Sequence, residues 1–245
     1  MSVPAAIIDL NNRAVSSLLQ GDSDAAVSSL TAAMSSLQNL RDVELEEQKQ
    51  QQQQAPPLSQ HWLAEKILES LSGESPMCSI PLSFTNSESA DGPGTFTLFN
   101  HALTISNSSS LMVSSVAKNY DRLLAMILYN MGMAFHTQAV RSGRSEELRG
   151  ALQLYEMSFS VVENAWVRFD VDDLTLFLMA LMNNLGHIHS SLYNAPQTQI
   201  CIEWLTALAG HPAFLRLMQR DQYAPFSLNL LVVLKQQQHH CSPAA

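Results

Sequence analysis

The sequence is poor in charge, in glycine and in aromatic residues, and each shortage excludes a class of protein. Charged residues make up only 14% of the 245 residues, and 22 acidic against 13 basic residues give a net charge of −9. Nucleic acids and anionic membranes are bound through clusters of Lys and Arg, so we expect neither as a partner. With 9 Gly and 7% aromatic residues, the chain does not resemble a large β-sandwich with many tight turns.

Cysteine and long apolar runs are also scarce. The 3 cysteines, Cys78, Cys201 and Cys241, lie too far apart for a zinc motif and are odd in number, which favours a reducing compartment. No stretch approaches the roughly 18 consecutive apolar residues of a transmembrane helix. The first residues have neither the basic nor the apolar region of a signal peptide. We therefore expect a cytoplasmic or nuclear protein that is neither secreted nor embedded in a membrane.

What the sequence does have is apolar residues at three- and four-residue steps, the spacing of amphipathic helices, over much of its length. Residues 1–54 are predicted to form two helices that meet at Gly21-Asp22. The tract Gln50–Gln54 is read either as the frayed end of the second helix or as an interaction tract. Residues 111–237 are predicted to form further long helices, with two short ones at about 212–220 and 225–237. Breaks are expected at Arg141–Ser145, Asn194–Pro196 and Gly210, and residues 238–245 are expected to form a disordered tail.

Residues 55–110 are the least helical part of the chain. A linker and a short helix over His61–Leu71 are expected first. Alternating polar and apolar residues at 79–84 and 95–105 then predict two strands that can pair as a hairpin. Phe99–Ile105 also fits a helix, and this alternative stays open at the level of sequence.

Three of the predicted helices contain the same pattern, an Asn followed two residues later by a small residue. A small residue lets a second helix approach closely, and paired helices must stack to bury their remaining apolar faces. The three copies are Asn12-Arg13-Ala14, Asn130-Met131-Gly132 and Asn184-Leu185-Gly186. The facing positions on the following helices include Ala26, Ala151 and Tyr155.

These residues resemble tetratricopeptide repeats (TPRs). The similarity is carried by Asn11–Ala33, Leu128–Phe135 and Met182–His189, although the loop after Gln138 is longer than in the family and the family's Pro after each second helix is missing. The chain is also similar to a group of TPR-like proteins from unicellular algae that share the phrases Phe-Asn-x-Ala, Tyr-Asn-Met and Asn-Asn-x-Gly-His-Ile. The resemblance implies a mainly α fold of stacked antiparallel helix hairpins, an α-α superhelix, with a small irregular or β insertion.

The resemblance also implies a concave groove lined by the first helix of each hairpin. Carried onto this chain, the peptide-binding residues are Met126, Tyr129, Met133, His136, Asn183 and His187. Members of the family that clamp a carboxylate use Lys and Arg there, which this chain lacks. We therefore expect these side chains to be partly exposed on one surface and to bind a peptide or helix of mixed apolar and polar character. The Met residues fit either core filling or such an adaptable groove.

No residue pattern predicts catalysis, a cofactor or a metal. His187 and His189 project to different sides of a helix and cannot share a metal ion. The run His239-His240-Cys241 lacks a fourth ligand, and Asp170–Asp173 fits helix capping rather than a calcium loop. The expected function is a non-catalytic protein–protein interaction module, a scaffold or adaptor, with another protein as partner. Two alternatives stay open: a structural subunit of a homo-oligomer, and an enzyme whose site is scattered along the sequence.

Overall fold

A computed structural model describes residues 3–52, 77–82, 98–105, 116–165 and 171–210. The predicted helices at 61–71, 212–220 and 225–237 and the predicted tail at 238–245 lie outside these ranges. The described residues are mainly helical, with a small two-stranded sheet, as the sequence predicts. Among them, no helix is both long and apolar enough to cross a membrane.

The helices pair in chain order, each with its neighbour in sequence. Each pair is joined by a short turn in which one residue, Gly21, Gly143 or Tyr193, has a positive φ. Asp22 also accepts a hydrogen bond at Oδ1 from the main-chain nitrogen of Ala25 at 2.9 Å, which caps the second helix. The pairs are α1 (Val3–Leu19) with α2 (Ser23–Gln52), α4 (Val116–Ser142) with α5 (Ser145–Ala165), and α6 (Val171–Ser191) with α7 (Ala195–Ala209).

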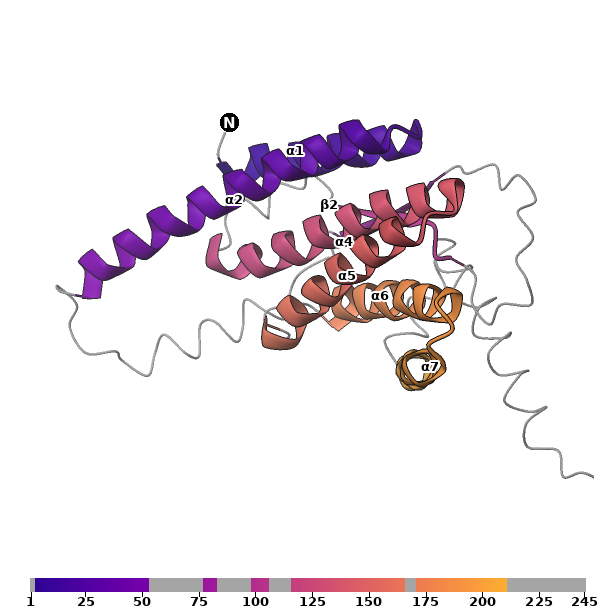
Figure 1. Cartoon of the computed structure of the whole chain (residues 1–245). Coiled ribbons are helices and arrows are strands. Elements are labelled where there is room, and N and C mark those ends of the chain that lie inside the picture. The colour runs from indigo at the N-terminus through magenta and orange to yellow at the C-terminus, as the bar shows by residue number, and fades with distance from the viewer. Residues whose placement is uncertain (1–2, 53–76, 83–97, 106–115, 166–170, 211–245) are drawn as a thin grey trace, which may run out of the picture.

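The three pairs lie in succession, because α2 packs on α4 and α5 packs on α6 (Figure 1). Helix α2 is longer than its neighbours, and in Figure 1 its C-terminal part extends past the start of α4. The predicted close approach inside the second pair is confirmed. A Cβ atom built on Gly132 of α4 would lie 2.6 Å from Cε1 of Tyr155 on α5, so only glycine fits there without displacing the ring. Ala14, Ala26 and Ala151 are likewise fully buried.

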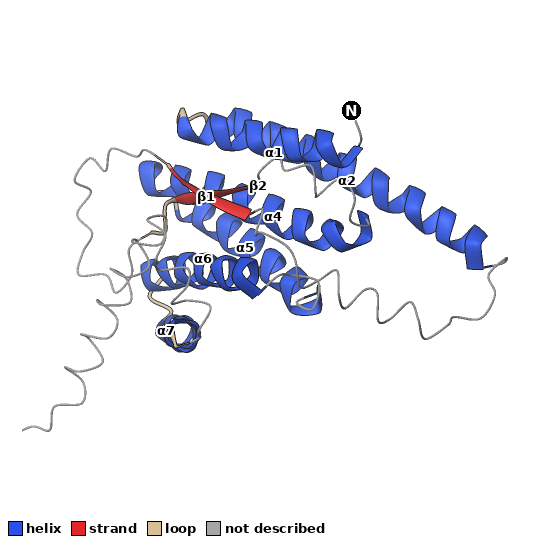
Figure 2. Ribbon diagram, turned by 180° about the vertical axis from the view of Figure 1, so that it is seen from behind, coloured by secondary structure: helices blue, strands red, loops and turns tan. Residues whose placement is uncertain are grey.

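The two strands, β1 (Met77–Pro81) and β2 (His101–Ile105), pair antiparallel, with Met77 opposite Ile105 and Pro81 opposite His101. The sequence-based prediction of paired strands is confirmed, and its helical alternative for residues 101–105 is wrong. Pro81 lies at the end of its strand, where a missing N–H is tolerated. Figure 2 shows the strands lying across the helices, and β2 packs against α1 and α4.

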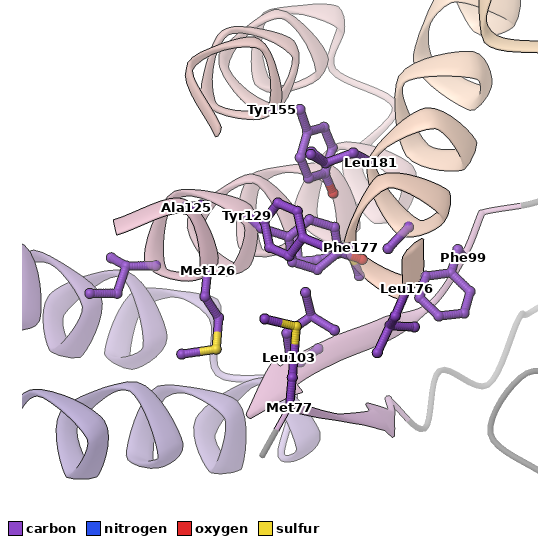
Figure 3. Close-up of a cluster of buried hydrophobic side chains, with 14 of the residues drawn as sticks. Met77, Phe99, Leu103, Ala125, Met126, Tyr129, Tyr155, Leu176, Phe177 and Leu181 are labelled. Atoms are coloured by element: carbon purple, nitrogen blue, oxygen red, sulfur yellow. The ribbon is translucent and has the colours of Figure 1, made fainter. Parts of the chain in front are cut away.

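Strands and helices share one hydrophobic core (Figure 3). Phe99 and Leu103 from the strand region are fully buried together with Tyr129 and Phe177 from the helices. All five residues of β2 are buried, so this strand is an interior element of the fold. The Met side chains at 126, 133, 179 and 182 are also buried, which supports core filling over an exposed methionine groove.

A buried ion pair links the second helix pair to the third, in addition to the packing of α5 on α6. Arg122 of α4 contacts Asp173 in the first turn of α6, and their side chains are 7% and 0% exposed. The sequence predicts Asp170–Asp173 only as helix-capping residues. Asp173 instead joins two helices that are distant in sequence, a role that the local pattern does not reveal.

Candidate functional site

The most specific arrangement of polar side chains surrounds the extended segment 98–105. Asn130, near the middle of α4, binds Leu103 at both of its main-chain groups. Its Oδ1 accepts the Leu103 N–H at 2.9 Å, and its Nδ2 donates to the Leu103 carbonyl oxygen at 2.7 Å. One carboxamide therefore satisfies a buried residue's donor and acceptor together, as a neighbouring strand would.

Helix α1 supplies two further carboxamides to the same segment. Asn11 Nδ2 donates to the Leu103 carbonyl oxygen at 3.2 Å, and Asn12 Nδ2 donates to the Ile105 carbonyl oxygen at 3.2 Å. Asn11 and Asn130 are also bound to each other, through a hydrogen bond of 2.9 Å from Nδ2 of Asn130 to Oδ1 of Asn11. The first and second helix pairs thus meet at Leu103.

Helix α6 binds the other end of the segment. Asn184 Oδ1 accepts the N–H of Phe99 at 3.0 Å, and its Nδ2 donates to the hydroxyl of Tyr129 at 3.1 Å. The Tyr129 hydroxyl in turn donates to the carbonyl oxygen of His101 at 3.0 Å. We call Asn11, Asn12, Asn130 and Asn184 the asparagine ladder.

The asparagine ladder binds one edge of the extended segment. Its contacts, with that of Tyr129, fall on residues 99, 101, 103 and 105, every second residue. The even-numbered residues face the other strand: Asn100 exchanges hydrogen bonds with Leu82, and the Thr104 hydroxyl donates to the Cys78 carbonyl oxygen. Because main-chain groups alternate along a strand in this way, three helices take the place of a second neighbouring strand.

Of the predicted groove residues, Tyr129 and Met133 lie beside Asn184 at this segment, and the prediction that the groove residues are partly exposed is wrong for most of them. Met126, Tyr129, Met133, His136 and Asn183 are all 0% exposed. Tyr129 is buried where its hydroxyl meets the main chain of residues 98–105, and His136 is buried where it packs against His187 and Tyr155. His187 alone of the predicted set is partly exposed.

The two predicted histidines form a pair beside the ladder, in which His136 is buried and His187 is partly exposed. His136 Nε2 lies 2.9 Å from His187 Nδ1, and the Tyr155 hydroxyl lies 3.4 Å from His136 Nδ1. Burial, with a smaller contribution from His187, holds the pKa of His136 well below 6.5. Tyr155 also accepts a hydrogen bond from Asn184 at 3.3 Å, so the histidine pair is connected to the ladder.

Other titrating groups near the segment are also shifted towards their neutral forms. The ring of His101 stacks on Phe99 with centroids 4.5 Å apart, and burial lowers its pKa to about 4. Burial raises the pKa of Tyr129 and Tyr155 above 10. Of these groups, the neutral Tyr129 hydroxyl hydrogen-bonds the main chain, at His101. Within the described ranges, no cluster of three or more His, Cys, Asp or Glu could hold a metal ion.

The sequence identified three of the four ladder positions but assigned them another role. The sequence predicts that Asn12, Asn130 and Asn184 mark helix packing, and the buried Ala14 and the close approach at Gly132 agree with this for the first two copies. The asparagines themselves bind the main chain of a segment elsewhere in the sequence. Asn11 was not predicted, although its position beside Asn12 repeats the Asn183-Asn184 pair and offered a signal.

Comparison with known proteins adds no family to this description: no protein-family model, no curated protein and no solved structure matches the chain.

Proposed function

We propose that this chain is a non-catalytic protein–protein interaction module, a scaffold or adaptor, whose TPR-like helix hairpins form an α-α superhelix that binds extended polypeptide on its concave face. The observation that carries the proposal is the asparagine ladder. Carboxamides from α1, α4 and α6 hold the main chain of residues 98–105 through hydrogen bonds to alternate residues. Hydrogen bonds to the main chain supply affinity in strand-like peptide recognition, and side-chain pockets supply specificity.

The ligand class follows from the contacts of the segment in the groove. The ladder hydrogen-bonds main-chain N–H and carbonyl groups, and every residue except proline has both. The side chains of Phe99, Leu103 and Ile105 are buried, so an extended ligand needs apolar residues at alternate positions. A partner segment with this pattern would replace residues 98–105 on the helices.

The free thiols of Cys78 and Cys201 suit the cytoplasmic or nuclear location that we propose for this module.

The test uses a chain in which the internal segment is weakened but the ladder is intact. Leu103→Ala removes a fully buried side chain and should cost about 2–5 kcal/mol, while its main-chain groups remain. A synthetic peptide with the sequence of residues 98–105 should then bind to this variant and raise its Tm, because a ligand stabilises the state it binds. The native chain should respond less, because its own segment competes.

The control is the same peptide methylated at the nitrogen of Leu103. This peptide keeps every side chain but lacks the N–H that Asn130 accepts. It should leave the Tm of Leu103→Ala unchanged. Equal stabilisation by the two peptides would show that the groove binds side chains alone, and the proposal of main-chain recognition would fail.

A further inference from the structure

A second surface of the molecule is hollowed where three helices meet away from the ladder. A groove with a volume of about 930 Å³ lies between α2, α4 and α5. We call it the α2–α4–α5 groove. Its lining includes Met34, Arg41, Tyr120, Leu124, Glu156 and Met157.

The shape of this groove follows from how the helices pack. Helices α2 and α5 both pack on α4, which leaves α4 as the floor between two walls. The floor residues Tyr120, Leu124 and Leu128 recur every four residues along α4. The floor and the two walls are each formed by one helix, so the groove matches the outline of a further helix. Helices bind in such grooves through anchor residues at i, i+3, i+4 and i+7.

The lining of the groove is mainly apolar and adaptable. Met157 is 55% exposed, an unusual position for a large apolar side chain. Met34 and Leu124 are half-buried and lie in the same groove. Methionine fits its flexible side chain to ligands of different shape, so this composition suits a protein partner.

The charges around the groove select the sign of that partner. Asp42 and Glu156 supply carboxylates to its lining. The guanidinium of Arg41 lies over the face of the Tyr120 ring, 5.5 Å from its centre, as in a cation–π interaction. The lining thus has two carboxylates against one guanidinium, and the whole chain carries a charge of −9. A cationic ligand is therefore favoured over an anionic one.

We propose that the α2–α4–α5 groove binds an amphipathic helix of a partner protein, with apolar anchors on one face and Lys or Arg on the flanks. This surface is separate from the asparagine ladder, so the two sites are tested independently. The carboxylates of Asp42 and Glu156 and the net charge of −9 also disfavour an anionic membrane as the occupant.

The experiment measures binding of labelled peptides to the full chain by fluorescence anisotropy. The probe is a synthetic helix of about 16 residues with Leu at i, i+4 and i+7 spacing and Lys at the flanks. Met157→Asp should weaken its binding by about tenfold or more, because a charge enters the apolar groove. Tyr193→Asp makes the same substitution at a residue that is 96% exposed and does not line the groove, and it should bind as the native chain does. Glu156→Lys should also weaken the basic probe.

Two further peptides distinguish binding in this groove from nonspecific charge attraction. A peptide of the same composition in scrambled order should bind at least about tenfold more weakly, because its apolar residues form no stripe. An analogue with Glu in place of Lys should also bind more weakly. Equal binding of ordered and scrambled peptides, or equal effects of Met157→Asp and Tyr193→Asp, would overturn the proposal. If the native chain dimerises as its concentration rises and the Met157→Asp variant stays monomeric, the groove would be assigned to a second copy of the chain instead.

Discussion

At the scale of single residues, asparagine is suited to this site because one side chain both donates and accepts. Asn130 uses both capacities on Leu103 and a third hydrogen bond on Asn11. Aspartate has the same shape but cannot donate when ionised. The difference between these two side chains therefore isolates the hydrogen bonds from the packing.

We expect Asn130→Asp to lower the free energy of unfolding by about 3 kcal/mol or more, because a buried charge then faces the oxygens of Leu103 and Asn11. Asn12→Asp should cost less, because Asn12 is only partly buried and makes one hydrogen bond to the segment. Urea unfolding of both variants measures the difference. Equal losses at the two positions would contradict the account.

At the scale of elements, the helices were predictable and the position of β2 was not. The three- and four-residue spacing predicted the helices, and the positive-φ turns at Gly21 and Gly143 fall at or near predicted breaks. Alternation of residue type predicted two paired strands. It carried no information about what lay on the far side of β2, because contacts such as Asn184 with Phe99 join residues far apart in sequence.

The same limit explains why the predicted exposure of the groove residues was wrong for most of them. The resemblance to TPRs predicts which side chains share a helix face, and in the structure Tyr129 and Met133 both contact Asn184. A pattern of residues on one helix cannot show that another segment covers that face. Residues such as Tyr129 are therefore buried core residues in this structure.

The contact between Arg122 and Asp173 gives a prediction for how strongly α4 is held to α6, a helix of the next pair. Asp173→Leu should lower the free energy of unfolding by about 3–5 kcal/mol, because it removes the buried carboxylate that Arg122 contacts. Adding Arg122→Met should restore much of that loss, because two apolar residues can replace a buried ion pair. A double-mutant cycle by urea unfolding gives the coupling, and additive losses would mean that the pair is not coupled.

At the scale of the whole molecule, the buried histidines make stability depend on pH. The pKa values of His101 and His136 are lowered in the folded chain, so the unfolded chain binds more protons below pH 6.5. Stability is therefore complete above about pH 6.5 and falls as the pH decreases towards the lowered values, by up to about 1.4 kcal/mol per pH unit for each histidine.

The pH dependence is tested by urea unfolding at several pH values between 7.5 and 5.5. Across this window His136→Gln should reduce the total change in unfolding free energy by about 1.4 kcal/mol, an average slope of about 0.7 kcal/mol per pH unit, because glutamine does not titrate. His101→Gln should have a similar effect. Stability that rises as the pH falls through this window would show that these histidines are not held neutral.

The central claim, that carboxamides of three helices hold the main chain of residues 98–105, is tested most directly by amide hydrogen exchange. The N–H groups of Phe99 and Leu103 should exchange slowly in the native chain, because Asn184 and Asn130 accept them in a buried site. In Asn130→Ala the Leu103 amide should exchange at least about tenfold faster, and its acceleration should exceed that of amides in α5, because the segment loses its local partner. A Leu103 amide that exchanges as fast as an unstructured peptide in the native chain, or that responds to Asn130→Ala no more than α5 does, would contradict the account.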